Sequence, residues 1–345
     1  MSELTVVAAG ARALLDLAVS RGASRKELLA RSRIDSAVLE NRDNRVEFGK
    51  YVSLMRAAQH LCKDPAFALR FGELVDVTEI SIACTIGGFT TLSDAITQMN
   101  HYASLGVEVE QAGSDGRYHL DHRGGQVWIV DARRNPNDFP ELTESSFARI
   151  VSSVRRTFGD VKFFKEMHFT HAEPAYRAEY DRVFRMPIVF ESGENAMQID
   201  EALVAMFKLP PRSSLVTSVL KERADALLEK LESSKSTRSR VEDLLIKLMP
   251  TGAVGVDAIA RELGLSRQTL FRKLKAEGAT FEQVLDELRF SMAHDYLDVR
   301  KLSIKETAYA LGFSDPTAFS RAFKRWTGRT PSIARRQRPS REARV

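Results

Sequence analysis

Cysteine is scarce in this 345-residue sequence: only Cys62 and Cys84 are present, and they form no CxxC pattern. Two such cysteines cannot build a multi-bridge disulfide framework or a four-cysteine zinc site, which excludes small disulfide-rich scaffolds and zinc ribbons. We interpret both residues as buried, reduced thiols of a cytoplasmic protein.

Long apolar runs are lacking as well. The longest, ISIACTIGGF at 80–89, is interrupted by Ser, Thr and two Gly, and it falls well short of the roughly 20 residues of a membrane helix. The first residues, MSELTVVAAGARALLDLAV, carry acids early and have no basic start followed by a cleavage site. Neither a signal peptide nor a membrane partner is therefore predicted.

Motifs for catalysis, cofactors and metals are also missing. Gly87 and Gly88 lack the following Lys of a phosphate loop, and no serine stands in a nucleophile elbow. His168 and His171 of the sequence HFTH are three residues apart, a spacing that places them on opposite faces of a strand. The sequence therefore predicts no enzyme, no cofactor and no metal site.

What the sequence does contain is an uneven distribution of charge. Residues 236–345 hold 21 Lys and Arg against 13 Asp and Glu, whereas residues 1–235 hold 30 against 33. A nearly neutral body joined to a basic module is the electrostatic pattern of a nucleic-acid-binding protein. At roughly 150 residues per domain, the length predicts two or three domains.

A short polar stretch separates the two parts. Within LLEKLESSKSTRSRVEDLL at 227–245, an apolar helical repeat gives way to Ser, Thr, Lys and Arg and then resumes. This composition is typical of an exposed connector. We predict an N-terminal domain at 1–232, a linker at 233–240, a basic C-terminal domain at 241–336 and a basic tail at 337–345.

The basic part contains a helix, a corner and a second helix in IARELGLSRQTLFRKLKAEG at 259–278. The apolar helical spacing ends at Leu263, Gly264 supplies a residue at which a positive φ is cheap, and Ser266 is placed as N-cap of the next helix. Two short helices around such a turn, the second of them basic outside, are typical of a helix-turn-helix.

The same pattern recurs in TAYALGFSDPTAFSRAFKRWTG at 307–328. Gly312 and Ser314 follow the corresponding Gly and Ser of the first copy by 48 residues. The second turn is one residue longer, and Pro316 suits the first turn of a helix because its missing N–H would be unpaired there. Ser314 or Asp315 can serve as the N-cap.

Apolar residues at helical spacing predict a connecting helix from about 281 to 298. Its roughly 17 residues span roughly 26 Å. With a helix-turn-helix at either end, the two recognition helices would lie about one DNA turn apart, ~34 Å. One chain could thus place two helices in successive major grooves of a duplex.

These residues resemble the AraC/XylS family of bacterial transcription regulators. The resemblance covers about 238–336 and is most specific in SIKETAYALGFSDPTAFSRAFKRWTGRTPSIAR. It implies contacts with double-stranded DNA from Ser266, Arg267, Gln268, Phe271, Arg272, Ser314, Thr317, Ala318, Ser320, Arg321, Lys324 and Arg329. Phe271 departs from the family, in which a polar residue is common at that place. An aromatic ring there could contact a thymine methyl or turn inward.

The N-terminal part is predicted to be α+β, with a helical start and a small antiparallel sheet. Apolar and polar residues alternate on both sides of the Gly-containing turns over 107–134, and this pattern predicts a three-strand meander. The other expected elements are helices over 4–18, 48–62, from about 93 and over 142–158, and a strand over 161–171. The fold class is thus an α+β domain followed by an all-α domain with two helix-turn-helix motifs joined by a linking helix.

The stretch AEPAYRAEYDRVFRMPIVFESGENAMQIDEALVAMFKLP at 172–210 resembles the arabinose-binding-like N-terminal domain of one branch of the family. The branch is named for homology and not for a ligand, and the sequence shows no sugar-pocket residues. The resemblance implies that residues 1–232 sense a small-molecule effector and form a homodimer. No motif in the sequence marks effector-binding residues.

Together, these resemblances imply a cytoplasmic, effector-controlled transcription regulator. Because members of this family are usually activators, the resemblance also implies an activator with RNA polymerase as a partner. Two alternatives belong to other classes. One is a ligand-independent architectural DNA-binding protein. The other is a DNA-repair alkyltransferase fused to a related DNA module, which needs an activated cysteine and zinc-ligand cysteines that Cys62 and Cys84 do not supply.

Overall fold

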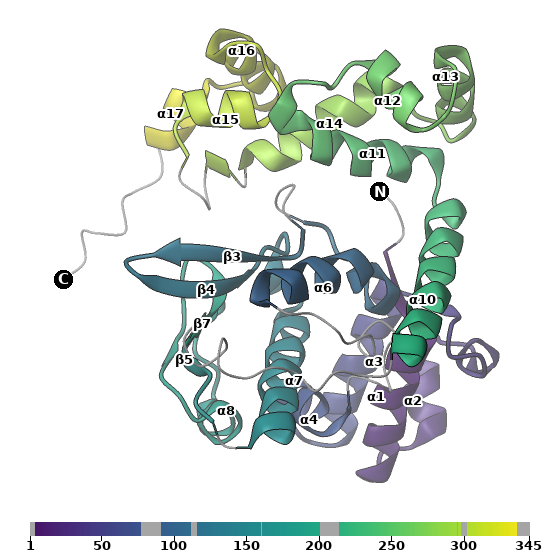
Figure 1. Ribbon diagram of the computed structural model, residues 1–345, viewed down its shortest axis with the longest axis vertical. Helices are drawn as coiled ribbons and strands as arrows, with labels where there is room; N and C mark the ends of the chain where they lie inside the picture. Colours follow the sequence, from purple (N-terminus) through teal and green to yellow (C-terminus); the bar gives the residue numbers. More distant parts are fainter. Residues whose placement is uncertain are drawn as a thin grey trace. The chain divides into compact units, whose positions relative to one another are not determined.

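The computed structural model describes residues 4–76, 91–111, 116–159, 161–200, 214–294, 296–297 and 302–336. Cys84, the apolar run at 80–89 and the basic tail at 337–345 lie outside this part. The chain forms two compact units, one comprising Glu3–Gln111 and Asp115–Ser233 and the other Ser234–Val345. We call them the N-terminal and C-terminal units (Figure 1).

Helices make up the first half of the N-terminal unit. They are α1 (Ala8–Ser20), α2 (Arg25–Ser32), α3 (Phe48–Leu61), α4 (Phe67–Leu74) and α6 (Leu92–Gly106). The helix expected from residue 4 begins only at Ala8, because β1 (Thr5–Val7) pairs antiparallel with β2 (Arg45–Glu47). The helices expected over 48–62 and from about 93 are confirmed.

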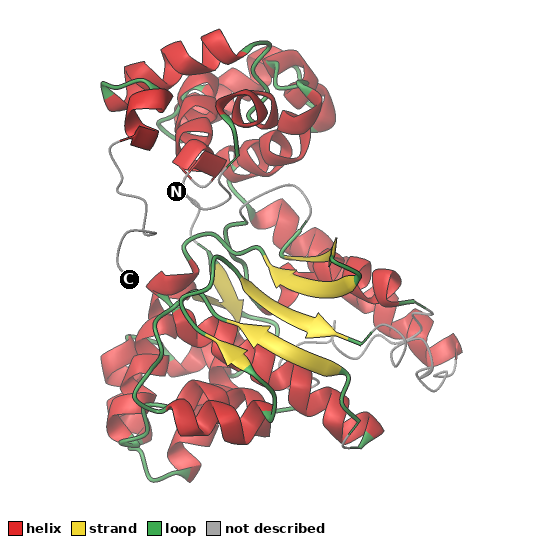
Figure 2. Cartoon of the chain, turned by 90° about the vertical axis from the view of Figure 1, so that its left-hand side faces the viewer, coloured by secondary structure: helices red, strands yellow, loops and turns green. Residues whose placement is uncertain are grey.

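The second half contains a five-stranded sheet and three further helices among the described residues (Figure 2). The strands, in spatial order, are β3 (Tyr118–Arg123), β4 (Gln126–Asp131), β7 (Asn195–Ile199), β5 (Phe164–His168) and β6 (Ile188–Val189). The helices are α7 (Pro140–Phe158), α8 (Arg177–Phe184) and α10 (Ser214–Ser234). The helix expected over 142–158 and the strand expected over 161–171 are confirmed.

Two expectations about this sheet are wrong. The three-strand meander is a two-strand hairpin, because 107–111 makes only isolated bridges, such as Val107 with Val6. The free edge of β4 is taken by β7, which comes more than sixty residues later in the chain. The sheet is also mixed and not purely antiparallel, since β5 and β6 pair in parallel. Alternation of apolar and polar residues predicts a strand but does not determine which strand it pairs with.

Helices α7 and α8 pack on the sheet and form one core with it. Phe147 of α7, Met167 of β5 and Tyr180 of α8 are fully buried in this cluster. Helix α4 lies so close to α7 that a Cβ atom on Gly72 would stand 2.2 Å from the carbonyl oxygen of Ser145. Glycine is therefore required at this helix crossing, and the crossing holds the buried face of α7 in place.

The C-terminal unit is all-helical in its described residues. Its helices are α11 (Thr237–Leu248), α12 (Val256–Glu262), α13 (Arg267–Ala276), α14 (Phe281–His294), α15 (Ile304–Ala310), α16 (Pro316–Thr327) and α17 (Pro331–Arg336). The expected fold class of both units is confirmed. Among the described helices, none has the length and apolar character to cross a membrane.

Candidate nucleic-acid interface

The first helix-turn-helix consists of α12 and α13. The turn contains Gly264 with φ of 65°, and the Leu265 N–H donates to the carbonyl oxygen of Ala260 at 2.8 Å. Ser266 caps α13 by accepting a hydrogen bond from the N–H of Thr269 at 3.2 Å. The predicted N-cap is thus confirmed, and it defines where the recognition helix begins.

The second helix-turn-helix consists of α15 and α16, and its turn has the same conformation. Gly312 has φ of 67°, and the Phe313 N–H donates to the carbonyl oxygen of Ala308 at 3.0 Å. Of the two candidate caps, Asp315 is the one used. Its carboxylate accepts from the N–H groups of Thr317 and Ala318, both at 2.8 Å. These N–H donors lower the pKa of Asp315, so the cap stays ionised near neutral pH.

Burial orients both recognition helices. Leu270 and Leu274 of α13 and Phe319 and Phe323 of α16 lie in the core of the unit, which leaves the opposite face of each helix to solvent. Nine of the predicted DNA-contacting residues are exposed: Ser266, Arg267, Gln268, Arg272, Ser314, Thr317, Arg321, Lys324 and Arg329. The other three, Phe271, Ala318 and Ser320, are half-buried.

The half-buried residues have local partners. Phe271 packs against the core, and the Arg267 guanidinium lies 5.4 Å from the centre of its ring. The Ser320 hydroxyl donates to the carbonyl oxygen of Pro316 at 2.8 Å, within its own helix. The ring of Phe271 therefore supports the side chain of Arg267, while Ala318 and Ser320 are small, half-buried residues of α16.

The exposed arginines differ in how they are held. Arg267 pairs with Asp257 at 3.4 Å and Arg325 pairs with Asp286 at 2.5 Å. Among the described residues, no ion pair involves Arg272 or Arg321. These two guanidinium groups keep their donors available for an external partner.

Helix α14 joins the two motifs through polar contacts that the sequence did not reveal. Arg289 donates to the carbonyl oxygens of Leu311 and Gly312, both at 2.9 Å, and stacks 4.0 Å above the ring of Phe313. These contacts fix the second turn to α14. Burial lowers the pKa of Arg289 below its usual value, but the group remains a cation near neutral pH.

A matching set of contacts fixes the first motif. The Glu277 carboxylate, just after α13, accepts from the N–H groups of Thr237 and Arg238 at 2.8 and 2.9 Å. Arg238 then reaches Glu287 of α14 at 2.5 Å. In the sequence, Glu277, Glu287 and Arg289 are indistinguishable from exposed charges of amphipathic helices. Only their long-range partners reveal that they hold the two motifs on α14.

The candidate cysteine and histidines show no arrangement for catalysis or metal binding. Cys62 is half-buried, where full burial was expected, and desolvation raises the pKa of its thiol. An activated thiol needs a lowered pKa. His168 contacts Glu166 at 2.7 Å, whereas His171 contacts the Tyr180 hydroxyl at 3.1 Å. Among the described residues, no group of His, Cys, Asp and Glu could hold a metal ion.

Two capped helix-turn-helix motifs, both fixed to one linking helix, define a DNA-binding module of the kind found in transcription regulators. Residues 259–337 match a helix-turn-helix domain family, and residues 22–206 match the arabinose-binding domain of AraC transcription regulators. The chain belongs to the AraC family of transcription regulators.

Individual relatives match over nearly the whole chain. The Ornithine utilization regulator of Pseudomonas aeruginosa is 29% identical over 335 residues, which is 95% of each chain. The regulator VirS of Mycobacterium tuberculosis is 24% identical and covers 92% of each chain. A crystal structure of the regulator CdpR from Pseudomonas aeruginosa shares 22% identity, covers 79% of this chain and 87% of its own, and has a TM-score of 0.35.

The protein is therefore a non-enzymatic, DNA-binding transcription regulator with an N-terminal effector-binding domain. The helix-turn-helix domain binds the DNA. This family membership excludes an alkyltransferase.

Proposed function

We propose that this protein is a sequence-specific transcription activator of the cytoplasm, where bacterial DNA and RNA polymerase are found. Residues 1–232 sense a small-molecule effector, residues 241–336 bind the operator, and 233–240 connect them. The proposal rests mainly on one observation. The two recognition helices α13 and α16 each expose one face to solvent, and both motifs are fixed to the same linking helix, α14. The effector acts by preferring the arrangement that binds DNA, since only differential affinity can shift such an equilibrium.

Arg272 and Arg321 read the sequence in this proposal. Each is exposed on a recognition helix whose register is set by a capped N-terminus. A guanidinium can donate two hydrogen bonds to O6 and N7 of guanine, which discriminates against a wrong base by about 1–3 kcal/mol. Lys324 and Arg329 contact phosphates, where a positive charge adds affinity without sequence preference.

The first prediction separates these roles. Arg272→Ala or Arg321→Ala should weaken binding to a selected operator by about 1–3 kcal/mol and weaken binding to random duplex much less. Lys324→Ala should weaken both equally and lower the slope of log affinity against log salt by about one. Competition titrations at two salt concentrations measure this. An equal loss on both DNAs for Arg321→Ala would make the second helix an anchor only.

The second prediction concerns assembly. The C-terminal unit already carries two recognition helices, so it needs no partner to span successive grooves. We propose that the protein forms a homodimer through its N-terminal domain. Sedimentation equilibrium should show a dimer for the full chain and a monomer for a fragment of residues 236–345. A monomeric full chain at roughly tens of micromolar, or a dimeric fragment, would contradict this assignment.

A further inference from the structure

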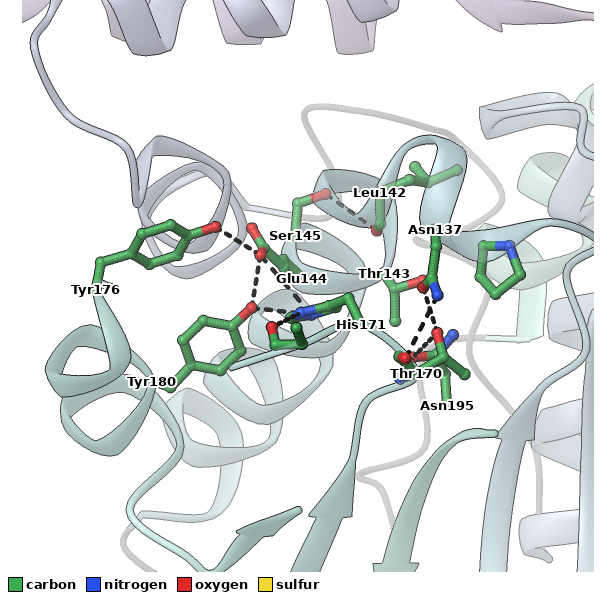
Figure 3. A network of polar contacts seen from close by, with 12 residues as sticks. Asn137, Leu142, Thr143, Glu144, Ser145, Thr170, His171, Tyr176, Tyr180 and Asn195 are labelled. Carbon is green, nitrogen blue, oxygen red and sulfur yellow. Dashed lines mark hydrogen bonds and ion pairs between the residues drawn. The ribbon is translucent and has the colours of Figure 1, made fainter. Parts of the chain in front are cut away.

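A polar network in the N-terminal unit contains a carboxylate with an unused oxygen (Figure 3). Glu144 of α7 is fully buried. Its Oε1 accepts hydrogen bonds from the hydroxyls of Tyr176 at 2.9 Å and Tyr180 at 2.5 Å. Within the described residues, its Oε2 is buried without a hydrogen-bond partner. A buried carboxylate oxygen without a donor is costly, so the network is incomplete as it stands.

The surroundings of Glu144 suit a positive charge. Glu141, one turn earlier on α7, also has a buried Oε2 that lacks a hydrogen-bond partner in the described residues. The ring of Phe190 lies 5.1 Å from that of Tyr180, and His171 Nε2 lies 4.0 Å from Glu144 Oε1. Carboxylates beside aromatic rings form the setting in which proteins hold ammonium groups.

A surface depression and this network have one residue in common, Tyr176. It has a volume of about 660 Å³ and is lined by Arg56, Gln59, His60, Lys63, Pro65 and Tyr176. Tyr176 is half-buried, and its hydroxyl is the one that donates to Glu144. The lining of the depression therefore includes the basic residues Arg56 and Lys63, and Tyr176 links the depression to the buried carboxylate of Glu144.

We propose that this depression and the network beneath it form the effector site, and that the effector is a small zwitterion of the amino-acid class. Its ammonium group donates to Glu144 after the phenol of Tyr176 turns aside, and its carboxylate faces Arg56 and Lys63. An amine without a carboxylate would be repelled by the basic residues of the depression. A carboxylic acid without an ammonium group would be repelled by Glu141 and Glu144. This inference rests on the proposed effector control.

Binding at this site is coupled to a proton. Burial raises the pKa of Glu144 to about 7, while hydrogen bonds from Tyr180 and Tyr176 oppose that shift and the nearby Glu141 adds to it. His171 faces the same space, and burial lowers its pKa, so it is neutral there near neutral pH. Without a bound ammonium group, Glu144 thus holds a proton below about pH 7. An arriving ammonium group requires the carboxylate form, and the displaced proton passes to solvent.

The test is a thermal-shift and calorimetric screen of the full chain with the common α-amino acids as probes. At least one of them should bind and raise the melting temperature. The decarboxylated amine and the deaminated acid derived from it should bind at least about ten-fold more weakly. Between about pH 6 and pH 8, the affinity should rise with pH and then level off above the pKa of Glu144.

Variants assign the binding to the site. Glu144→Gln keeps the acceptors for both tyrosines but should lower the affinity at least about ten-fold and remove its pH dependence. Lys63→Gln, in the turn that follows α3, should lower the affinity several-fold. Lys50→Gln, on α3 and paired with Glu47, should not change it. The proposal is overturned if no amino acid binds, or if binding persists unchanged in Glu144→Gln. Operator binding measured in the same samples shows whether the proposed DNA-binding function stands independently.

Discussion

Replacing Arg117 by Met is expected to lower the free energy of unfolding of the N-terminal unit by about 3–5 kcal/mol. Arg117 and Asp131 form an ion pair whose side chains are 4% and 0% exposed, with Nε and Oδ1 3.1 Å apart. A second contact joins Nη2 to Oδ2 at 3.3 Å. The substitution leaves the Asp131 carboxylate buried without this cation, and that penalty exceeds the modest net value of the intact pair.

Urea unfolding of the full chain in a Trp326→Phe background, followed by the fluorescence of Trp128 on β4, the strand that carries Asp131, measures this loss. The matched control is Arg31→Met, which removes the exposed pair with Glu27, whose side chains are 45% and 44% exposed. Its expected cost is no more than about 0.5 kcal/mol. Equal small effects of both substitutions would show that Thr143, which donates to Asp131, and Arg133 hold the carboxylate without Arg117.

The features that could be predicted from the sequence are those encoded over a few residues. The turn glycines Gly264 and Gly312 and the cap Ser266 have the positions that their local spacing indicates. Each depends on a φ angle or on a hydrogen bond to a residue three positions away. The 48-residue repeat then predicted the double motif, since two copies of a local signal are far more specific than one.

What could not be predicted depends on partners distant in the chain. Asp131, Glu144 and Arg289 are charged residues in otherwise ordinary elements, and such positions are usually solvated. The burial of Asp131 and Glu144 follows from β7 pairing with β4 and from Gly72 admitting α7, and the partial burial of Arg289 follows from the second turn meeting α14. The exposed faces of α13 and α16 were the opposite case, because an exposed face beside an apolar face can be found from periodicity alone.

The contacts of Arg289 lead to the second large effect, on the geometry of DNA binding. Arg289→Met removes both donors to the carbonyl oxygens of Leu311 and Gly312 and the stacking on Phe313. Each buried acceptor left without a donor costs about 1–3 kcal/mol. The second motif is then expected to lose its fixed orientation on α14, while the first, held by Glu277 and Arg238, keeps its own.

A merely structural role would lower binding to all operators alike, whereas a positioning role changes the dependence on half-site spacing. One added or removed base pair turns the second half-site by roughly 35° about the DNA axis, since a turn holds about 10–10.5 pairs. The native protein should lose affinity steeply on such operators. Arg289→Met should bind the original operator roughly ten-fold more weakly and discriminate less among spacings. Lys305→Met, an exposed change on α15, should leave the spacing preference unaltered. If Arg289→Met kept the native preference while binding more weakly, α14 and its apolar contacts alone would set the separation of the two recognition helices.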